Sequence, residues 1–558
     1  MSAYERYNGW SRAQLLRRIM QLEAGEVLTP EPNVGPTAQG IYTHEAEKAK
    51  SKKPRPYDVS AQASRKIALR FCYDGAYYSG LAAQSSQVTP LPTVEETIWD
   101  AMCIARLVDP EKGMEGAGWS RCGRTDAGVS AAGQVVALWV RSRSMDERTI
   151  RSRNEETPVK DELDAMPVRI SEEEELPYVA TLNRLLPPTI RIQAWSPVSP
   201  HFSSRFDCQY RHYKYFFTLG APHSLTWQRQ SSSHFPKRLD ITRMRKAAAR
   251  LVGEHDFRNL CKVDASKQIT NFVRRIDGAT IDEVAVGWPT TQEAPVHLPV
   301  TPANEPMFVL NLRGSAFLYH QVRNIVAVLF MVGAGLEEPT IMDALINVRP
   351  GAVLQDHART INWILSLPDD ATPDKILFRA LGTPANDLTV FETKPSYEMA
   401  ADRPLMLWEC GFLPTHVSWR ADTYDGPFDA ISSAKEYTPT LKATSQLHAQ
   451  WTQTSIHAEL YRHFVLSSAS TKTSALPSQS TFAAACTPMV PAPADQEPSK
   501  QGVQLVPLGN GATRPTTRYI PLTMRPRDVS YEVKNEKWRT GKGKRRAEKK
   551  AASGAAQD

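Results

Sequence analysis

The segment SRCGRTDAGVSAAGQVVAL, residues 120–138, holds the side chains best suited to chemistry. Asp126 stands at the apex of a predicted polar turn between two strands, with Arg124 two residues before it. A carboxylate beside an arginine stays ionised because the cation lowers its pKa, and an ionised, oriented carboxylate is a competent nucleophile. The same pattern also fits an ordinary turn aspartate beside a solvent-facing arginine. From the local chemistry alone, the second interpretation is favoured.

Hydrophobic periodicity indicates the elements that would position this turn. Period-two alternation predicts strands, and apolar residues spaced three or four apart predict helices. The predicted strands are residues 66–75, 133–140, 211–220, 273–286, 307–317 and 405–413. The predicted helices are residues 93–107, 240–252 and 320–332. This mixture, with neighbouring strands that look antiparallel, indicates an α+β fold.

Composition narrows the class of protein. The chain has 558 residues, of which 41% are hydrophobic and 23% charged, and its net charge of +7 is compatible with a polyanionic partner. Its seven cysteines are scattered and form no CxxC pair, which argues against a disulfide framework and a zinc ribbon. There is no P-loop, no GxGxxG fingerprint and no metal-ligand cluster, so we expect neither a cofactor nor a metal. No run approaches the ~18 apolar residues of a membrane span, and no membrane association is expected.

Changes in composition along the chain predict its organisation. The predicted segments are an N-terminal helix in 1–23, a linker in 24–64, a catalytic N-terminal subdomain in 65–225 with a charged insertion in 141–177, a C-terminal subdomain in 226–414, a helical extension in 415–465, a disordered stretch in 466–516 and a basic tail in 517–558. The disordered stretch is rich in Ser, Thr, Ala and Pro, which cannot bury enough apolar surface to form a core.

Several segments resemble one protein family. RCGRTDAGVSA followed by GQVV (121–136) resembles the signature of the tRNA pseudouridine synthases, whose bacterial member modifies the anticodon arm of tRNA. YDGAYYSG (73–80) resembles the first strand motif of that family, and the similarity extends over residues 65–413. The resemblance implies two related α+β subdomains, with mixed or antiparallel sheets flanked by helices around a basic RNA-binding cleft. It also implies that Asp126 is the catalytic nucleophile.

Three further segments carry residues that the family uses. FSSRFDCQYRHYKYFF (202–217) resembles the motif with an active-site tyrosine, which falls on Tyr213. GSAFLYHQVRNIVAVLFMVGAG (314–335) resembles the motif whose arginine faces the aspartate, which falls on Arg323. PLMLWECGF resembles the strand that lines the uracil pocket, with Leu405 as its leucine. Without the resemblance, these side chains would be interpreted as a sheet-core aromatic, an arginine with a buried stem and plain core packing.

The implied reaction assigns a role to each residue. Pseudouridine formation breaks the glycosidic bond of a uridine, turns the uracil and joins its carbon 5 to the sugar, without net redox change. Arg323 would orient and ionise Asp126, and Tyr213 is a candidate to relay or remove the proton of carbon 5. The uridine must leave its RNA stem, and Arg124 is a candidate to fill the gap. Arg205 is a further predicted substrate contact.

Local features resemble the eukaryotic branch of the family, of fungal type, that modifies uridines 38 and 39 of tRNA. These features are the SRCGRTD…GVSA form, GLAAQ (80–84) and VGEHDFRNLCKVD (252–264). Ser130 stands where bacterial members carry His, whereas eukaryotic members often carry Lys at the position of Ala127. The expected partner is the tRNA anticodon stem-loop, and a homodimer is carried over from bacterial relatives. The basic segment 537–550 fits added non-specific RNA affinity, a nuclear import signal or an ordinary solvated, disordered end. The expected location is cytoplasm and nucleus.

Three other functions compete with this hypothesis. A phosphatase with an aspartate nucleophile needs a second aspartate two residues away and a magnesium site, and RTDAG lacks that aspartate. A non-catalytic tRNA-binding or chaperone protein would have no need of Asp126, Tyr213 and Arg323. The same chemistry on other tRNA positions or on other RNAs stays open, because target choice depends on surfaces that a sequence does not display.

Overall fold

The computed structural model describes eleven stretches of the chain: residues 62–84, 89–143, 175–219, 239–284, 306–367, 378, 380–420, 438–470, 504–509, 513–516 and 518–545. All of them belong to one unit, Asp58–Asp558. The predicted N-terminal helix, nearly all of the linker and most of the charged insertion lie outside the described residues, as does most of the stretch predicted to be disordered.

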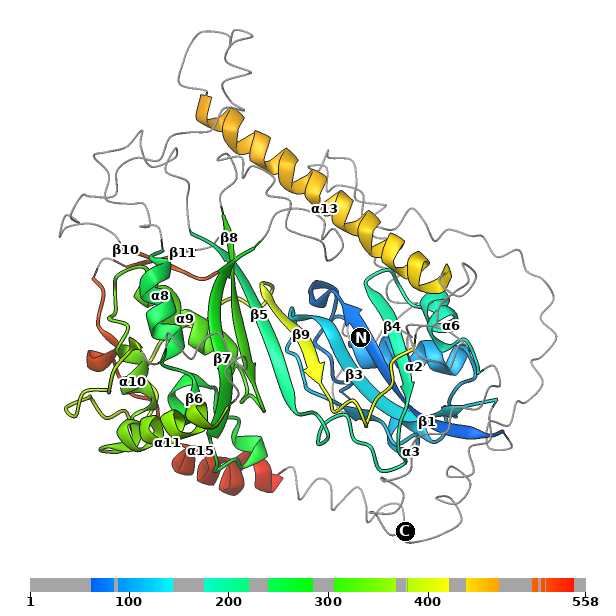
Figure 1. Cartoon of the computed structure of the whole chain (residues 1–558), viewed down its shortest axis with the longest axis horizontal. Helices are drawn as coiled ribbons and strands as arrows, with labels where there is room; N and C mark the ends of the chain where they lie inside the picture. The colour runs from blue at the N-terminus through cyan, green and yellow to red at the C-terminus, as the bar shows by residue number, and fades with distance from the viewer. Residues whose placement is uncertain are drawn as a thin grey trace, which may run out of the picture. The chain divides into compact units, whose positions relative to one another are not determined.

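A mixed sheet runs through the described part of the chain in the order β4-β1-β3-β9-β5-β8-β7-β6, with the short β2 paired to β3 (Figure 1). Its strands are β1 Ser64–Tyr73, β2 Ser120–Arg121, β3 Ser130–Arg141, β4 Ile190–Pro197, β5 Tyr210–Thr218, β6 Gly253–Asp256, β7 Val273–Glu283, β8 Met307–Gly314 and β9 Leu405–Gly411. Neighbouring strands pair antiparallel except β3 and β9, which are parallel. The predicted α+β class is confirmed.

The strand β9 joins the two halves of the sheet. It pairs with β3 on one side, where Ser130 faces Met406 and Ala131 faces Leu407, and with β5 on the other. The sheet is therefore continuous across the two halves. β5 also lies within residues 65–225, the predicted N-terminal subdomain, yet its partners are β8 and β9 in the other half. Hydrogen-bonded pairing, rather than sequence order, decides to which half this strand belongs.

Helices cover both halves of the sheet (Figure 1). They are α2 Val94–Ile104, α3 Gly113–Gly116, α6 Tyr178–Leu185, α8 Ile241–Ala249, α9 Gln321–Gly333, α10 Ile341–Ile346, α11 Ala352–Ser366 and α13 Thr438–Ser470. α6 packs on β4, α8 packs on β7 and α9, and α11 packs on β6. The sequence explains α2 well, because Thr93 and Glu96 form the predicted capping box at its start. None of the helices in the described ranges is long and apolar enough to span a membrane.

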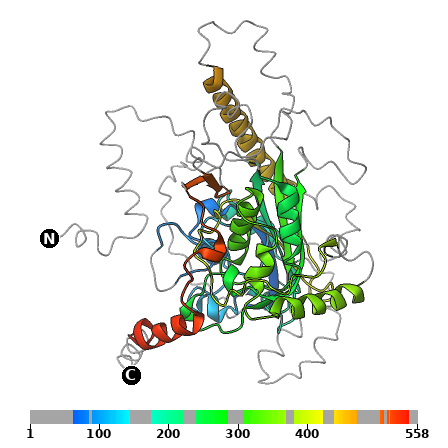
Figure 2. The same cartoon turned by 90° about the vertical axis from the view of Figure 1, so that its left-hand side faces the viewer.

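The last described part of the chain folds back on the C-terminal half. β10 Gln504–Pro507 pairs with β11 Thr513–Thr516 inside the stretch predicted to be disordered, and α15 Tyr531–Trp538 with the following turn Arg539–Gly543 lies inside the predicted tail. Figure 2 shows these segments, coloured orange to red, beside the helices of that half. The Tyr531 ring lies 5.0 Å from that of Phe272, so residues 518–545 are not a solvated tail. The stretch predicted to be disordered, 466–516, thus contains two paired strands, and the predicted basic tail contains a helix. Composition alone does not register the long-range contacts that single aromatic residues make.

Candidate active site

Residues 122–129 connect β2 to β3 at the junction of the two halves of the sheet and carry Asp126. We call them the nucleophile loop, after the role that the resemblance implies for Asp126. Three hydrogen bonds from other parts of the chain hold it in place. The hydroxyls of Tyr73 and Thr125 lie 2.6 Å apart, the Leu81 amide donates to the Thr125 carbonyl at 3.2 Å, and the Gln134 side-chain amide donates to the Gly123 carbonyl at 2.9 Å. The carboxylate is thereby presented on a fixed backbone, as an oriented nucleophile requires.

Two glycines allow the neighbouring backbones to approach this loop closely. A Cβ on Gly75 would lie 2.2 Å from the Val129 carbonyl oxygen, so no larger residue fits beside the loop there. Gly128 has a φ of +81°, which L residues with side chains rarely adopt, and it closes the turn after Asp126. Both glycines belong to segments that the sequence analysis singled out.

Asp126 contacts a histidine that sequence reasoning missed. The Nε2 atom of His320 lies 3.3 Å from Oδ2 of Asp126, and the exposed fractions of the two side chains are 6% and 29%. His320 precedes α9 with a φ of +59°, and its ring lies against that of Tyr319 with centroids 3.8 Å apart. The available signal was its position three residues before Arg323 in the helix motif, but neither spacing nor periodicity distinguishes this histidine from a helix cap.

Burial, opposed by cations, governs the charge of Asp126. Burial raises the pKa of Asp126 above its ordinary value, whereas Arg323 and Lys267 act to lower it. The expectation that Arg124 lowers this pKa is wrong, because the net direction is upward and the opposing cations come from other segments. Burial, helped by Arg323, lowers the pKa of His320 to about 4, so its imidazole is neutral at pH 7. The contact of 3.3 Å therefore joins a neutral ring to the carboxylate rather than two opposite charges.

Arg323 lies next to Asp126 without pairing with it directly. Its Nε donates to the Ala400 carbonyl at 2.8 Å, and its ion pair, at 3.9 Å, is with Asp402. Within the described residues no ion pair of 4.0 Å or less joins Arg323 to Asp126, which differs from the expected direct partnership. Asp402 also approaches the nucleophile loop, because a Cβ on Gly128 would meet its carboxylate at 2.8 Å. The arginine thus lies between two carboxylates and acts on Asp126 through its field.

Tyr213 and Leu405 occupy the strands that meet at the junction. Tyr213 on β5 faces Leu407 on β9, its side chain is buried, and its ring packs edge-on against Phe317 at 5.0 Å. Its hydroxyl is 4.0 Å from the point that a Cβ on Gly123 would occupy, which places it beside the nucleophile loop. Leu405 is the first residue of β9 and is buried.

The two predicted arginine contacts are exposed. Arg124 lies in the nucleophile loop two residues from Asp126. Arg205 precedes β5, with its guanidinium 5.4 Å from the exposed ring of Phe206, and its carbonyl accepts a hydrogen bond from Arg211 at 2.8 Å. Both side chains remain available to a partner, and neither shares an ion pair with Asp126 in the described part of the chain.

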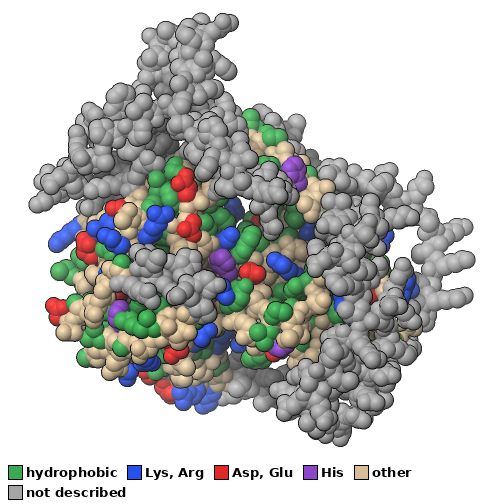
Figure 3. Space-filling view, viewed as in Figure 1, with side chains coloured by type: hydrophobic (Ala, Val, Ile, Leu, Met, Phe, Trp, Pro, Cys, Tyr) green, Lys and Arg blue, Asp and Glu red, His purple; other side chains and the backbone are tan. Residues whose placement is uncertain are grey.

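Cations and an exposed aromatic ring surround the Asp126–His320 pair. The ammonium groups of Lys262 and Lys267 lie 5.8 Å and 5.2 Å from the ring centroid of Tyr319, whose side chain is 37% exposed. Lys262, Lys267, Arg323 and the half-buried Lys394 make up what we call the cationic rim. On the face shown in Figure 3, however, basic and acidic side chains are interspersed, so the positive charge gathers locally rather than along one continuous surface.

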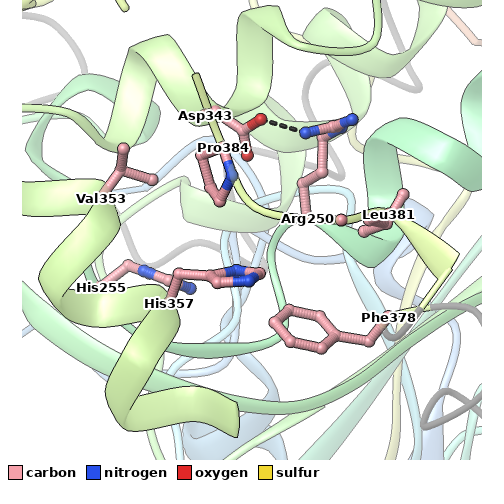
Figure 4. A pocket seen from close by; sticks show the side chains of 9 residues that line it. Arg250, His255, Asp343, Val353, His357, Phe378, Leu381 and Pro384 are labelled. Atoms are coloured by element: carbon pink, nitrogen blue, oxygen red, sulfur yellow. Dashed lines mark hydrogen bonds and ion pairs between the residues drawn. The ribbon is translucent and has the colours of Figure 1, made fainter. Parts of the chain in front are cut away.

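A separate polar pocket lies in the C-terminal half. Arg250, His255, Asp343, His357 and Phe378 are among its lining residues, and Arg250 forms an ion pair with Asp343 (Figure 4). None of the residues predicted for catalysis or substrate contact lines this pocket. This pocket is therefore separate from the place where the residues predicted for catalysis lie.

Several known proteins are similar to this chain in sequence. A family model described as tRNA pseudouridine synthase matches residues 247–356. A Saccharomyces cerevisiae tRNA pseudouridine(38/39) synthase is 37% identical over 427 residues, which cover 75% of this chain and 74% of that protein. The Homo sapiens protein of the same name is 34% identical over 421 residues, covering 75% and 70%. A Bordetella parapertussis tRNA pseudouridine synthase A is 30% identical over 284 residues, covering 51% and 83%.

The extent of these matches identifies the class of the protein. The chain belongs to the tRNA pseudouridine synthase family. Members of that family are isomerases that convert uridine to pseudouridine in tRNA, and this chain is a tRNA-modifying enzyme of that kind.

Proposed function

We propose that this enzyme isomerises uridines 38 and 39 in the anticodon arm of tRNA, with Asp126 as the nucleophile. The observation that carries the proposal is a carboxylate on a tightly held loop, in contact with a neutral histidine at 3.3 Å and surrounded by cations. The two eukaryotic relatives described above are both named for positions 38 and 39. Their similarity over three quarters of this chain supports the same target.

The geometry supports a different role in the reaction for each of the site residues. Asp126 opens the glycosidic bond of the flipped uridine, and the positive charge of Arg323 favours the ionised form of the Asp126 carboxylate. Burial raises the pKa of Tyr213 far above its ordinary value, so its hydroxyl keeps its proton at neutral pH. Tyr213 therefore relays a proton as an intact phenol or packs against the base, rather than acting as a free phenolate. Leu405 closes the apolar side of the site.

The cationic rim is suited to hold the RNA. Lysine side chains grip phosphates without reading sequence, and an exposed aromatic ring stacks on a base that has left its helix. Lys262 and Lys267 flank the exposed ring of Tyr319 in such an arrangement. Arg124 is exposed on the nucleophile loop and is our candidate to enter the gap that the flipped uridine leaves.

Target choice can be tested directly. Purified enzyme is incubated with tRNA transcripts that carry uridine at 38, at 39, at both or at neither, and pseudouridine is located by chemical sequencing. We expect conversion at 38 and 39 only. Conversion confined to other positions would reject this target while leaving the catalytic proposal in place. Transcripts with no uridine at either position serve as the control.

The pH dependence should reveal the cations that act on Asp126. Because the reaction needs the ionised carboxylate and burial raises its pKa, activity should fall on the acid side at a pH above 3.8, the ordinary value. Lys267→Met removes a cation that lowers this pKa, so the acid limb of kcat/KM should move to higher pH. The matched control is Lys112→Met, because Lys112 and Lys267 each pair with an aspartate three residues earlier. If kcat/KM falls at the same acid pH in the two variants, the assigned role of Lys267 is contradicted.

A further inference from the structure

Three cysteines from distant parts of the chain meet beside the active site. The Sγ atoms of Cys122, Cys208 and Cys410 all lie within 4.8 Å of one another. All three side chains are buried, with exposed fractions of 2%, 8% and 9%. Their separation in the sequence hid this cluster, which the sequence analysis interpreted as scattered thiols.

Each cysteine belongs to a segment that shapes the site. Cys122 begins the nucleophile loop, four residues before Asp126, and its amide donates to the Val135 carbonyl at 2.9 Å. Cys208 lies two residues before β5, the strand of Tyr213, and Cys410 lies on β9, the strand that joins the two halves. A bond among these sulfurs would therefore tie together the three segments on which catalysis depends.

A buried arginine supplies the charge that such a cluster needs. Arg211 is 9% exposed, and it donates to three backbone carbonyls, those of Ser315 at 2.6 Å, Cys122 at 2.9 Å and Arg205 at 2.8 Å. Among the residues that the structure describes, it forms no ion pair with a carboxylate. A buried cation without a counter-charge is costly, and the three thiols are among the ionisable groups whose negative charge would stabilise it.

We propose that Cys122, Cys208 and Cys410 bind a zinc ion as thiolates. On binding, each thiol gives up one proton to solvent and forms one sulfur–zinc bond, with no change of oxidation state. The three negative charges of the thiolates are then balanced by the two positive charges of zinc and the one of Arg211, so the buried centre is neutral. A monovalent soft ion such as Cu⁺ would leave one negative charge uncompensated.

The distances fit this assignment with little movement. Bonds of about 2.3 Å in a tetrahedral zinc site place its sulfurs roughly 3.8 Å apart, so each observed separation needs to shorten by at most about 1 Å. Zinc normally takes four ligands, and three cysteines leave one position for a water molecule or a backbone oxygen. The competing explanation is that the thiols pack as small apolar groups, which accounts for their burial but not for the uncompensated charge of Arg211.

The test uses the full chain, produced with zinc in the medium and purified without chelators or a metal-binding tag. Elemental analysis should find about one zinc per chain. Cys208→Ala and Cys410→Ala should each lose it, whereas Cys103→Ala should keep it, because Cys103 lies on α2 outside the cluster. Circular dichroism verifies that each variant is folded.

A second measurement does not depend on how the variants fold. Wild-type enzyme depleted of zinc is titrated with Co²⁺, and ligation by thiolates should produce the ultraviolet charge-transfer absorption typical of cobalt–sulfur bonds, saturating at about one ion per chain. Wild-type enzyme without zinc and without this absorption would overturn the proposal. So would a disulfide within the cluster found by mass spectrometry. One copper per chain would overturn the choice of zinc.

Discussion

Replacing Asp126 with Asn should abolish pseudouridine formation, with kcat reduced by about 10⁴-fold or more, because the reaction loses its nucleophile. The amide has nearly the same shape as the carboxylate and cannot attack the sugar or the base. The hydrogen bonds that hold the loop involve Thr125 and Gly123 and not the Asp126 side chain, so the loop should keep its position. Since burial already disfavours the charge of Asp126, the neutral variant should fold at least as stably as the wild type.

The control is a carboxylate in the same neighbourhood. Asp402→Asn removes one negative charge near Arg323 and near the nucleophile loop but leaves Asp126 in place. It should retain most activity, and because Asp402 raises the pKa of Asp126, its acid limb should move to lower pH. Binding of tRNA, measured by filter retention at fixed salt, should be similar in both variants. Full activity of Asp126→Asn would eliminate the proposed mechanism.

The sequence predicted the nucleophile loop better than its surroundings. Asp126, Tyr213 and Leu405 could be placed because each lies in a strand or turn whose partners follow from a long local motif. The junction formed by the parallel pairing of β3 with β9 was not visible, because only two residues of each strand take part. The return of the chain at residues 504–545 was missed for a related reason. It depends on single contacts such as the hydrogen bond, 2.6 Å long, from Tyr519 to Glu337.

Two wrong expectations about the site, the direct pairing of Arg323 with Asp126 and the omission of His320, have a geometric cause. The motif implied that Arg323 faces the aspartate, but the hydrogen bond to the Ala400 carbonyl and the pairing with Asp402 determine where its guanidinium points. The neighbouring histidine takes the contact instead. This outcome depends on a backbone conformation at one residue, the positive φ of His320, which no periodicity predicts.

That backbone conformation allows a sharp test of His320 as a positioning residue. In His320→Gln the side-chain amide can reach the place of the ring Nε2 and keep a polar contact with Asp126, whereas in His320→Asn the amide ends near the place of Nδ1 and falls short. Asn, however, tolerates a positive φ better than Gln. If the histidine serves only as a helix start, Asn should therefore be the better replacement. If it positions the carboxylate, Gln should be.

We expect the second result: His320→Asn should lower kcat by about 10²-fold, with KM nearly unchanged, and His320→Gln should recover most of that loss. Steady-state rates on tRNA carrying uridine 39, measured from pH 5 to pH 9, provide both constants. Because burial lowers the pKa of His320 to about 4, its titration should add no limb between pH 5 and pH 8 in the wild-type profile. A faster His320→Asn than His320→Gln would show that the backbone conformation, and not the contact with Asp126, is what His320 contributes.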